Sequence, residues 1–376
     1  MPILLQYLFV IGTFQGFLLS SLLLFTPNIS YASRILGLWC SLLALGLLLV
    51  LIVQGSAIEP NSLFLALTGF LPASYGAFLY LYCRHSVLDD GFQRKDLLHL
   101  IPVASCYLLN FDLILAPDVV VQAYLQGVEP TNIRYILGVT ILYAQAFIYI
   151  AYSVHFLYRY QQRAQNNYAS FNPDVFDWLW IVQGFNLIIW SSKVASIVLG
   201  HNIVLVIGGD ILIVVLIYTI GMAQWRNPLL FRIAVPLQEA LVVSTDDKNS
   251  KIAGALDEST RISVLETVDQ YMKQQQAFLD NELSLRRLSE AVGVSTHHLS
   301  EVLNQKEGQN FYNFVNDFRV EYVCECLKLD NDIGLLDLGL KAGFSSKSSF
   351  NSVFKKHTGV TPSQYRIKVS NSAASS

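Results

Sequence analysis

Two short stretches near the C-terminus carry polar side chains whose types and spacing suit hydrogen bonding to nucleic-acid bases. Their outward positions are, in chain order, His297, Ser300, Glu301 and Asn304, then Lys347, Ser348, Asn351, Ser352 and Lys355. Asparagine can pair bidentately with adenine, lysine can donate to guanine, and glutamate can accept from the amino group of cytosine. These stretches are therefore candidates for reading base edges in a major groove.

Two helix–turn–helix patterns would hold these side chains in place. In the first, Gly293 supplies a tight turn and Ser295 is suited to cap the next helix. In the second, Gly343 begins the turn, and either Ser345 or Ser346 caps the helix that follows. Leu285, Leu288, Ala291 and Val292 make one apolar helical face before the first turn, and Leu336, Leu340 and Ala342 precede the second turn. In the helices that follow the turns, the predicted inward-facing residues are Leu299, Val302 and Leu303, then Phe350, Val353 and Phe354.

Basic charge is concentrated around the second pattern. Six lysine or arginine residues and no acidic residue lie between Lys341 and Lys368. Such a patch supplies affinity for phosphates, so Lys356 and Arg366 join the candidate DNA contacts. The first pattern is less basic, and Glu301 would repel phosphate. A solvated helix face can imitate one helix–turn–helix, whereas two in tandem are a stronger indication.

The segment Leu283–Arg366 resembles the DNA-binding domain of AraC/XylS-type transcriptional regulators. The matching runs are LSLRRLSEAVGVSTHHLSEVLN, FVNDFRVEYV and LGLKAGFSSKSSFNSVFKKHTGVTPSQYR. NFYNFVNDFR is similar to the linker helix of the branch that carries multi-span N-terminal domains. The resemblance covers about a quarter of the chain and implies seven helices, with two recognition helices in successive major grooves. It also implies promoter DNA and RNA polymerase as partners.

By the same resemblance, base-reading positions are His297, Ser300 and Glu301 in the first recognition helix, and Lys347, Ser348, Asn351 and Ser352 in the second. Three positions depart from the common pattern. Ser289 and Gly339 stand where many members have alanine, and Glu301 stands where a basic residue is common. We expect the first two to weaken packing slightly and the third to weaken the first recognition helix.

The composition of the chain indicates a membrane protein. Hydrophobic residues make up 53% of the 376 residues and charged residues 14%, against about 25% charged in soluble domains. The net charge is −3, so the chain as a whole is not basic. The five cysteines show no metal-ligand spacing and suit packed free thiols in a reducing compartment.

Seven segments reach the roughly 20 apolar residues that a bilayer-spanning helix needs. They are Ile3–Phe25, Ile35–Val53, Leu63–Cys83, Leu97–Leu115, Ile133–Tyr158, Phe176–Leu199 and Ile203–Gln224. The prolines at 72 and 102 fall inside two of them and would kink helices locally. The predicted fold class is therefore all-α, with a seven-helix transmembrane bundle followed by a cytosolic helical domain.

The connections between these segments differ in charge and predict an orientation. One alternating set contains Arg34, Arg84, Arg94, Lys95, Arg159, Arg163, Arg226 and Arg232. The other set contains Glu59, Asp118 and Glu129 and no basic residue, apart from Arg134 at a helix start. The positive-inside rule puts the first set in the cytoplasm. The N-terminus is then outside and the C-terminal domain inside, in a bacterial inner membrane.

Ionisable residues inside the predicted spans suggest a signal site. Lys193 and Asp210 fall at nearly the same depth on adjacent helices, and Asp112 and Arg134 form a weaker candidate pair near the outer face. Such groups usually face the bundle interior. A pair there could sense a small-molecule or membrane-derived signal, or could only fix helix packing, and both readings stay open.

The predicted domains are a membrane domain at 1–225, a juxtamembrane linker at 226–261 and a DNA-binding domain at 262–376. Within the last we expect the helix–turn–helix units at about 284–305 and 334–357, with a linker helix at about 310–329 between them. The helix Ile262–Phe278 either packs on this domain or forms a dimer.

The leading hypothesis is a membrane-embedded, one-component transcriptional regulator that is not an enzyme, uses no cofactor and contacts membrane lipid. A homodimer is plausible, because a tethered monomer gains from binding two half-sites. One rival is a transporter or membrane enzyme with a DNA-binding appendage. The other is an interaction protein whose helix–turn–helix units no longer bind DNA.

Overall fold

α-Helices make up nearly all of the regular structure. The computed structural model describes residues 2–27, 29–54, 69–88, 91–115, 132–170, 173–200, 202–226, 257–306, 309–329 and 333–374. Within these ranges there is no β-strand, only one isolated antiparallel bridge between Tyr168 and Ser284. The all-α prediction is confirmed. The chain divides into two units, one of Met1–Leu157 and Trp178–Val235, the other of Tyr158–Asp177 and Pro236–Ser376.

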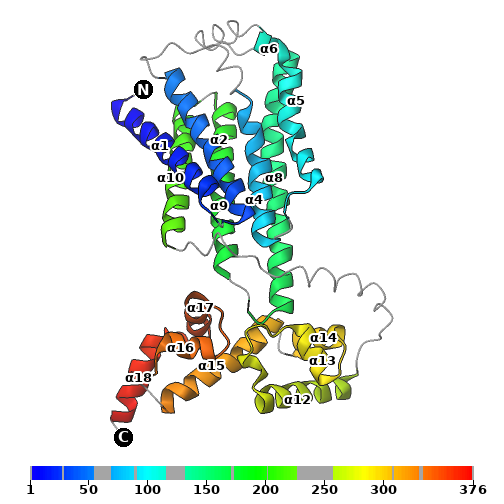
Figure 1. Ribbon diagram of the computed structural model, residues 1–376. Helices are drawn as coiled ribbons and strands as arrows, with labels where there is room; N and C mark the ends of the chain where they lie inside the picture. The colour runs from blue at the N-terminus through cyan, green and yellow to red at the C-terminus, as the bar shows by residue number, and fades with distance from the viewer. Residues whose placement is uncertain are drawn as a thin grey trace. The chain divides into compact units, whose positions relative to one another are not determined.

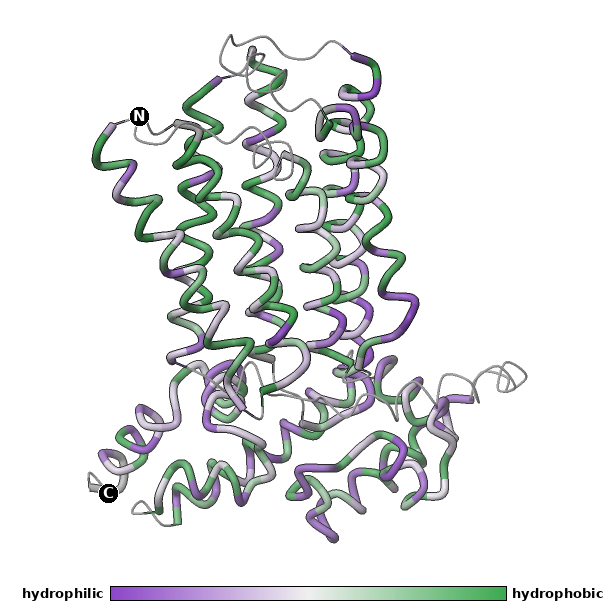
Figure 2. Tube along the Cα trace, turned by 45° about the horizontal axis from the view of Figure 1, so that its top comes forward, coloured by the Kyte–Doolittle hydropathy of each residue, from purple (hydrophilic) through white to green (hydrophobic). Residues whose placement is uncertain are grey.

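The first unit holds the apolar helices (Figure 1). They are α1 (Ile3–Phe25), α2 (Tyr31–Gln54), η1 (Leu71–Ser74), α4 (Tyr75–Val87), η2 (Arg94–Leu100), α5 (Ile101–Leu109), α6 (Phe111–Leu115), α8 (Ile133–Asn167), α9 (Pro173–Val198) and α10 (Ile203–Arg226). α1 packs on α2 and α10, and α2 packs on α4. Figure 2 shows these long helices as mostly hydrophobic.

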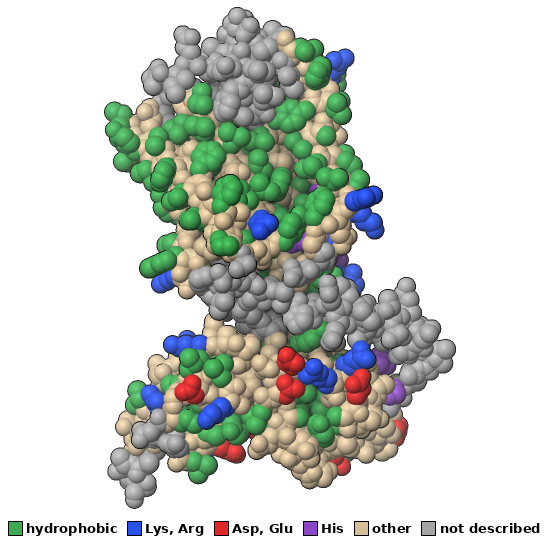
Figure 3. Space-filling view, in the orientation of Figure 1, with side chains coloured by type: hydrophobic (Ala, Val, Ile, Leu, Met, Phe, Trp, Pro, Cys, Tyr) green, Lys and Arg blue, Asp and Glu red, His purple; other side chains and the backbone are tan. Residues whose placement is uncertain are grey.

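Five helices among the described residues are long and apolar enough to cross a membrane, namely α1, α2, α8, α9 and α10. Each coincides with a predicted span. Large apolar side chains such as Phe14, Leu22 and Ile148 are exposed on them, and Figure 3 shows hydrophobic side chains spread over the visible face of this unit, with few charged ones among them. Exposed apolar surface of this extent suits contact with lipid. Membrane association is thus supported, while the count of seven spans stays a prediction.

The other two predicted spans look different. Much of Leu63–Cys83 lies outside the described residues, and its described part is η1 followed by α4. The prediction of one continuous helix over Leu97–Leu115 is wrong, because η2, α5 and α6 replace it. Pro102 stands in the first turn of α5, where a missing N–H is tolerated. Asn110 ends α5, and its Nδ2 donates to the carbonyl of Cys106 at 3.0 Å.

The second unit contains seven α-helices among its described C-terminal residues, the number that the resemblance implies. They are α12 (Glu258–Gln275), α13 (Leu285–Val292), α14 (Thr296–Lys306), α15 (Phe311–Leu329), α16 (Leu335–Lys341), α17 (Lys347–Thr358) and α18 (Pro362–Ala374), with the short η4 (Ala277–Leu279). α12 packs on α13 and α14, with Val268 and Met272 fully buried. This favours the packing reading of that helix over the dimer reading.

The predicted boundary at 225/226 does not describe the division fully. Residues 158–177, from the end of α8 to the start of α9, belong to the second unit. Ala169 lies in its core, beside Leu283, Leu285 and Phe311. The five cysteines are free thiols, of which Cys40, Cys83 and Cys106 are buried.

Candidate nucleic-acid interface

The first helix–turn–helix unit consists of α13, a glycine turn and α14. Ser284 caps α13 by accepting a hydrogen bond from the backbone N–H of Arg287 at 3.3 Å. Gly293 has the left-handed φ of 71° that glycine adopts without strain. Ser295 caps α14 by accepting from the N–H of His298 at 3.1 Å. Leu299, Val302 and Leu303 are buried, so the opposite face of α14 points outward.

Side chains at the predicted reading positions of α14 differ in accessibility. His297 and Asn304 are exposed, whereas Ser300 and Glu301 are half-buried. Asn304 Nδ2 donates to Ser300 Oγ at 3.3 Å. Glu301 is only 17% exposed and lies 3.7 Å from a guanidinium nitrogen of Arg261 in α12. Arg261 opposes the acidic charge that made this helix look unfavourable for phosphate, and no sequence pattern pointed to that partner.

The second helix–turn–helix unit consists of α16, the Gly343 turn and α17. Ser346, not Ser345, is the cap, and its Oγ accepts from the N–H of Ser349 at 3.1 Å. Phe350, Val353 and Phe354 are buried. The space beside Gly339 is filled by Phe350, because a Cβ at position 339 would lie 2.8 Å from the ring of Phe350. The expectation that Gly339 weakens packing is therefore wrong, since the glycine makes room for that ring.

The outer face of α17 is basic. Lys347, Ser348, Ser352, Lys355 and Lys356 are exposed, and Asn351 and Arg366 are half-buried. Lys356 Nζ lies 3.5 Å from Asn313 Oδ1 of α15, and His357 contacts Asp317 of the same helix. Exposed positive charge of this kind attracts phosphates.

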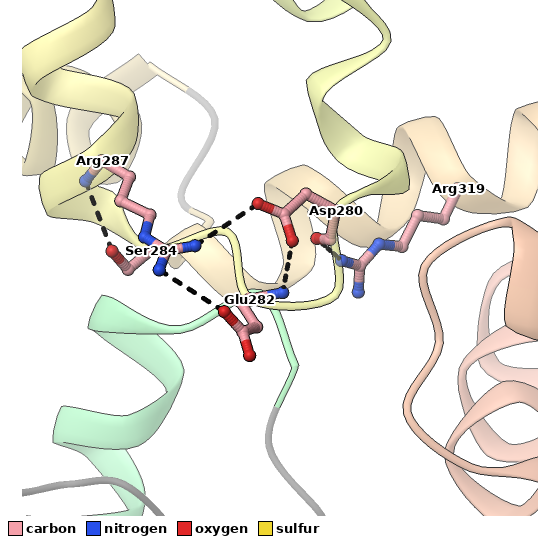
Figure 4. A network of polar contacts seen from close by, with 5 residues as sticks. All are labelled: Asp280, Glu282, Ser284, Arg287 and Arg319. Atoms are coloured by element: carbon pink, nitrogen blue, oxygen red, sulfur yellow. Dashed lines mark hydrogen bonds and ion pairs between the residues drawn. The ribbon is translucent and has the colours of Figure 1, made fainter.

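Arg319 of α15 is buried between the loop that precedes α13, residues 169–170 and the ring of Phe344 in the turn before α17. Its side chain is 1% exposed, and it makes five hydrogen bonds. They run to the carbonyls of Phe278 (2.7 Å), Ala169 (3.0 Å) and Asp280 (2.9 Å), to Ser170 Oγ (2.9 Å) and to Asn316 Oδ1 (3.3 Å). Figure 4 shows the guanidinium beside Asp280, next to the polar contacts of Arg287 at the start of α13. Sequence reasoning missed this residue, because its partners are distant in the chain.

Burial lowers the pKa of Arg319 to about 10, with desolvation as the main cause. The guanidinium therefore remains charged at neutral pH. Gly343 lies against it, since a Cβ there would be 2.7 Å from the carbonyl oxygen of Phe278 and 2.9 Å from Arg319 Nε. Gly343 also has a φ of 90°. The close contacts and the positive φ thus each require glycine at the turn of the second helix–turn–helix unit.

In the unit that holds the apolar helices, the structure brings together Lys193 and Asp210, the residues predicted to pair inside the membrane. Lys193 Nζ lies 2.5 Å from Asp210 Oδ1 and 3.3 Å from the carbonyl of Val206. The Asp210 side chain is 5% exposed, and among the described residues its Oδ2 has no hydrogen-bond partner. The other candidate pair is looser, with Arg134 Nη1 4.0 Å from Asp112 Oδ2 and both side chains largely exposed.

A second ion pair in this unit was not predicted. Arg84 Nη1 lies 2.5 Å from Asp96 Oδ1, and the Asp96 side chain is 1% exposed. Desolvation acts to raise the pKa of Asp96, but the N–H of Gln93 and the Arg84 charge outweigh it and hold the pKa below its usual value. The pair fastens η2 to the end of α4 and involves two residues from connections predicted as cytoplasmic.

Comparison with known proteins supports the reading of the C-terminal helices. Residues 288–368 match a family model described as a helix-turn-helix domain. An uncharacterized HTH-type transcriptional regulator of Staphylococcus aureus strain COL is 43% identical over 88 residues, which are 23% of this chain and 11% of that protein. The uncharacterized transcriptional regulatory protein YesN of Bacillus subtilis strain 168 is 31% identical over 82 residues, 22% of each chain.

The chain therefore spans only about a tenth of the length of the first of these relatives. Two solved structures are also similar in part. One, from Listeria innocua and of unknown function, is 29% identical, covers 27% of this chain and 93% of its own, and has a TM-score of 0.24. The C-terminal domain of AraT, a response regulator from Geobacillus stearothermophilus, is 27% identical, covers 28% and 84%, and has a TM-score of 0.25.

The family model and the named relatives agree on one part of the molecule. The C-terminal helices form an AraC-type helix–turn–helix domain, as the resemblance implied.

Proposed function

We propose that the chain is a membrane-embedded transcriptional regulator that binds promoter DNA in a sequence-specific manner. One observation carries the proposal: an AraC-type domain with two capped helix–turn–helix units shares a chain with five long apolar helices. The function is binding and signalling rather than catalysis.

In this proposal α14 and α17 enter successive major grooves. His297, Ser300, Glu301 and Asn304 face bases from α14, and Lys347, Ser348, Asn351 and Ser352 face bases from α17. Lys355, Lys356 and Arg366 bind phosphates. The exposure of His297, Lys347 and Ser348, and the lack of acidic residues between Lys341 and Lys368, support this assignment.

The proposed location is a bacterial inner membrane, with the N-terminus outside and the DNA-binding domain in the cytoplasm. The charge bias of the connections supports this orientation. RNA polymerase is the proposed protein partner at the promoter, and a homodimer would place two such domains on paired half-sites. Membrane lipid surrounds the apolar helices.

The proposed signal site is the Lys193–Asp210 pair, with Asp112 and Arg134 as a weaker second location. A buried ion pair with one unpartnered carboxylate oxygen is expensive in lipid. A ligand that donates to Asp210 Oδ2 would bind one arrangement of α9 and α10 better than another, as allosteric coupling requires.

The test uses the full chain in lipid nanodiscs and a library of bacterial genomic fragments. Bound fragments are recovered and sequenced, and their affinity is measured at about 50 and 200 mM salt. We expect enrichment of a common sequence and a steep fall in affinity with salt, because lysine–phosphate contacts release counterions. Undetectable or salt-insensitive binding would overturn the proposal. The variant with Lys347, Lys355 and Lys356 all changed to alanine is the control.

A further inference from the structure

Residues 165–170, here called the docking segment, belong to the same unit as the DNA-binding domain and contact it directly. They comprise the end of α8 and the residues after it. The sequence places them in a connection between two predicted spans, and the structure groups them with the C-terminal unit. Ala169 is fully buried in that unit's core. The docking segment therefore packs against the helices of the DNA-binding domain.

The docking segment pairs with the start of the first helix–turn–helix. Tyr168 and Ser284 form an antiparallel bridge, and the N–H of Ala169 donates to the carbonyl of Leu283 at 3.1 Å. Ser284 is the N-cap of α13. A displacement of the docking segment therefore acts directly on the residue at which α13 begins.

The same segment contacts Arg319 of α15 and the glycine turn before α17. Arg319 donates to the carbonyl of Ala169 and to Ser170 Oγ. Ser170 Oγ in turn donates to the carbonyl of Gly343, in the turn before α17, at 3.3 Å. Three parts of the DNA-binding domain, namely the residues before α13, Arg319 of α15 and the Gly343 turn, thus meet at Ala169 and Ser170 of the docking segment.

The docking segment also reaches the predicted reading face of α14. Asn166 lines one small pocket together with Ser300 and Asn304, two of the proposed base-reading residues. Gln165 Oε1 accepts from Asn310 Nδ2 at 3.2 Å, just before α15. A helix end in this position occupies space beside side chains that would have to approach a base edge.

We propose that the docking segment is an autoinhibitory clasp, whose docked state weakens DNA binding and whose release increases it. The inference rests on the proposed function and adds its regulation. In the docked state the segment lies beside Ser300 and Asn304 of α14, and it holds Arg319 and the Gly343 turn through Ala169 and Ser170. The signal then acts by changing how often the segment is docked, since a ligand shifts an equilibrium by its preference for one state.

A reversible disulfide tests the clasp in the full chain. Residues opposite each other in a non-hydrogen-bonded antiparallel pair have Cα atoms about 4.5 Å apart, within the range that a disulfide accepts. We would make Y168C/S284C, reconstitute it in nanodiscs, and compare its oxidised and reduced forms on the same DNA. The reduced form is the matched control, because both forms carry the same substitutions. Y168C and S284C alone control for oxidation of other cysteines.

We expect the disulfide to form and the oxidised protein to bind DNA about tenfold more weakly than the reduced protein, an effect in the usual range of allosteric coupling. Failure of the disulfide to form would overturn the docking itself. A disulfide with unchanged or tighter binding would overturn autoinhibition. If the wild-type protein binds no DNA at all, the proposed function is contradicted. That outcome is distinct from failure of the clasp, in which the wild-type protein binds DNA but the disulfide does not weaken binding.

Ser170→Ala tests the opposite direction without a cross-link. It removes the hydroxyl that links Arg319 to the Gly343 turn, so docking should weaken and DNA affinity should rise severalfold. Ser263→Ala, at an exposed position of α12, is the control and should leave affinity unchanged. An S170A protein that is folded, as shown by unchanged exchange protection of α15, but binds no more tightly than wild type would contradict the clasp.

Discussion

At the residue scale, Arg319 is a buried charge whose five acceptors are neutral oxygens. Lysine has three donors on one nitrogen and cannot reproduce the planar fork of arginine. Arg319→Lys should therefore leave buried carbonyls unpaired and cost about 2 kcal/mol or more of stability in this unit. Amide hydrogen exchange of α15 in the full chain measures this loss. Arg286→Lys, at an exposed i,i+4 pair, should change protection little, and an equal effect of both would contradict the argument.

A second residue-scale prediction concerns the Glu301–Arg261 pair. Removing Arg261 takes away a positive charge 3.7 Å from the Glu301 carboxylate on the proposed DNA face, so Arg261→Ala should lower DNA affinity several-fold. Glu301→Gln should raise it, most clearly at low salt, where charge repulsion is least screened. Fragment-binding affinities of both variants test this. Equal effects of the two substitutions in the same direction would show that the pair has no electrostatic part in DNA binding.

At the element scale, the caps decide where the recognition helices begin. Ser346 caps α17 and the neighbouring exposed Ser345 does not. Ser346→Ala should destabilise the domain by about 1 kcal/mol, the usual cost of losing an N-cap. Ser345→Ala is the matched control and should be neutral. Exchange protection of α17 provides the measurement, and equal losses in the two variants would contradict the assignment of the cap.

Much of this architecture follows from local sequence patterns. Apolar periodicity and glycine turns located α13, α14, α16 and α17, and long apolar runs located α1, α2, α8, α9 and α10. Pro102 indicated a local kink in Leu97–Leu115, but hydropathy does not register that α5 begins beside Pro102 and ends at Asn110. Arg319 with Ala169, and Arg261 with Glu301, are contacts between residues distant in the chain, and one sequence holds no signal for such pairs.

At the scale of the whole molecule, the variant Lys193→Ala distinguishes a signal-sensing role of the Lys193–Asp210 pair from a role in helix packing alone. Lys193→Ala leaves the Asp210 carboxylate buried without its partner, which is costly in lipid. If the pair senses a signal, the variant should reach normal membrane levels but fail to change transcription from the target promoter when the signal is supplied. If the pair only holds α9 to α10, the protein level itself should fall. Immunoblotting beside a promoter reporter measures both.

The same variant in a D210A background completes the comparison. Removing both charges eliminates the unpaired buried group, so protein level should recover under the packing reading while the signal response should stay absent under the sensing reading. A double variant with normal level and normal response would exclude a sensing role for Lys193 and Asp210.

α8 gives the molecule a property that depends on helical phase. It is a single helix of 35 residues, Ile133–Asn167, and the division between the two units falls inside it. Each added residue turns whatever follows by about 100° and moves it by about 1.5 Å. Alanine insertions after Leu157 should therefore change DNA binding in a periodic way: three or four near one full turn, and seven near two turns, should disturb the response less than two or five. A response that only declined with insertion length would mean that α8 acts as a tether and transmits no rotation.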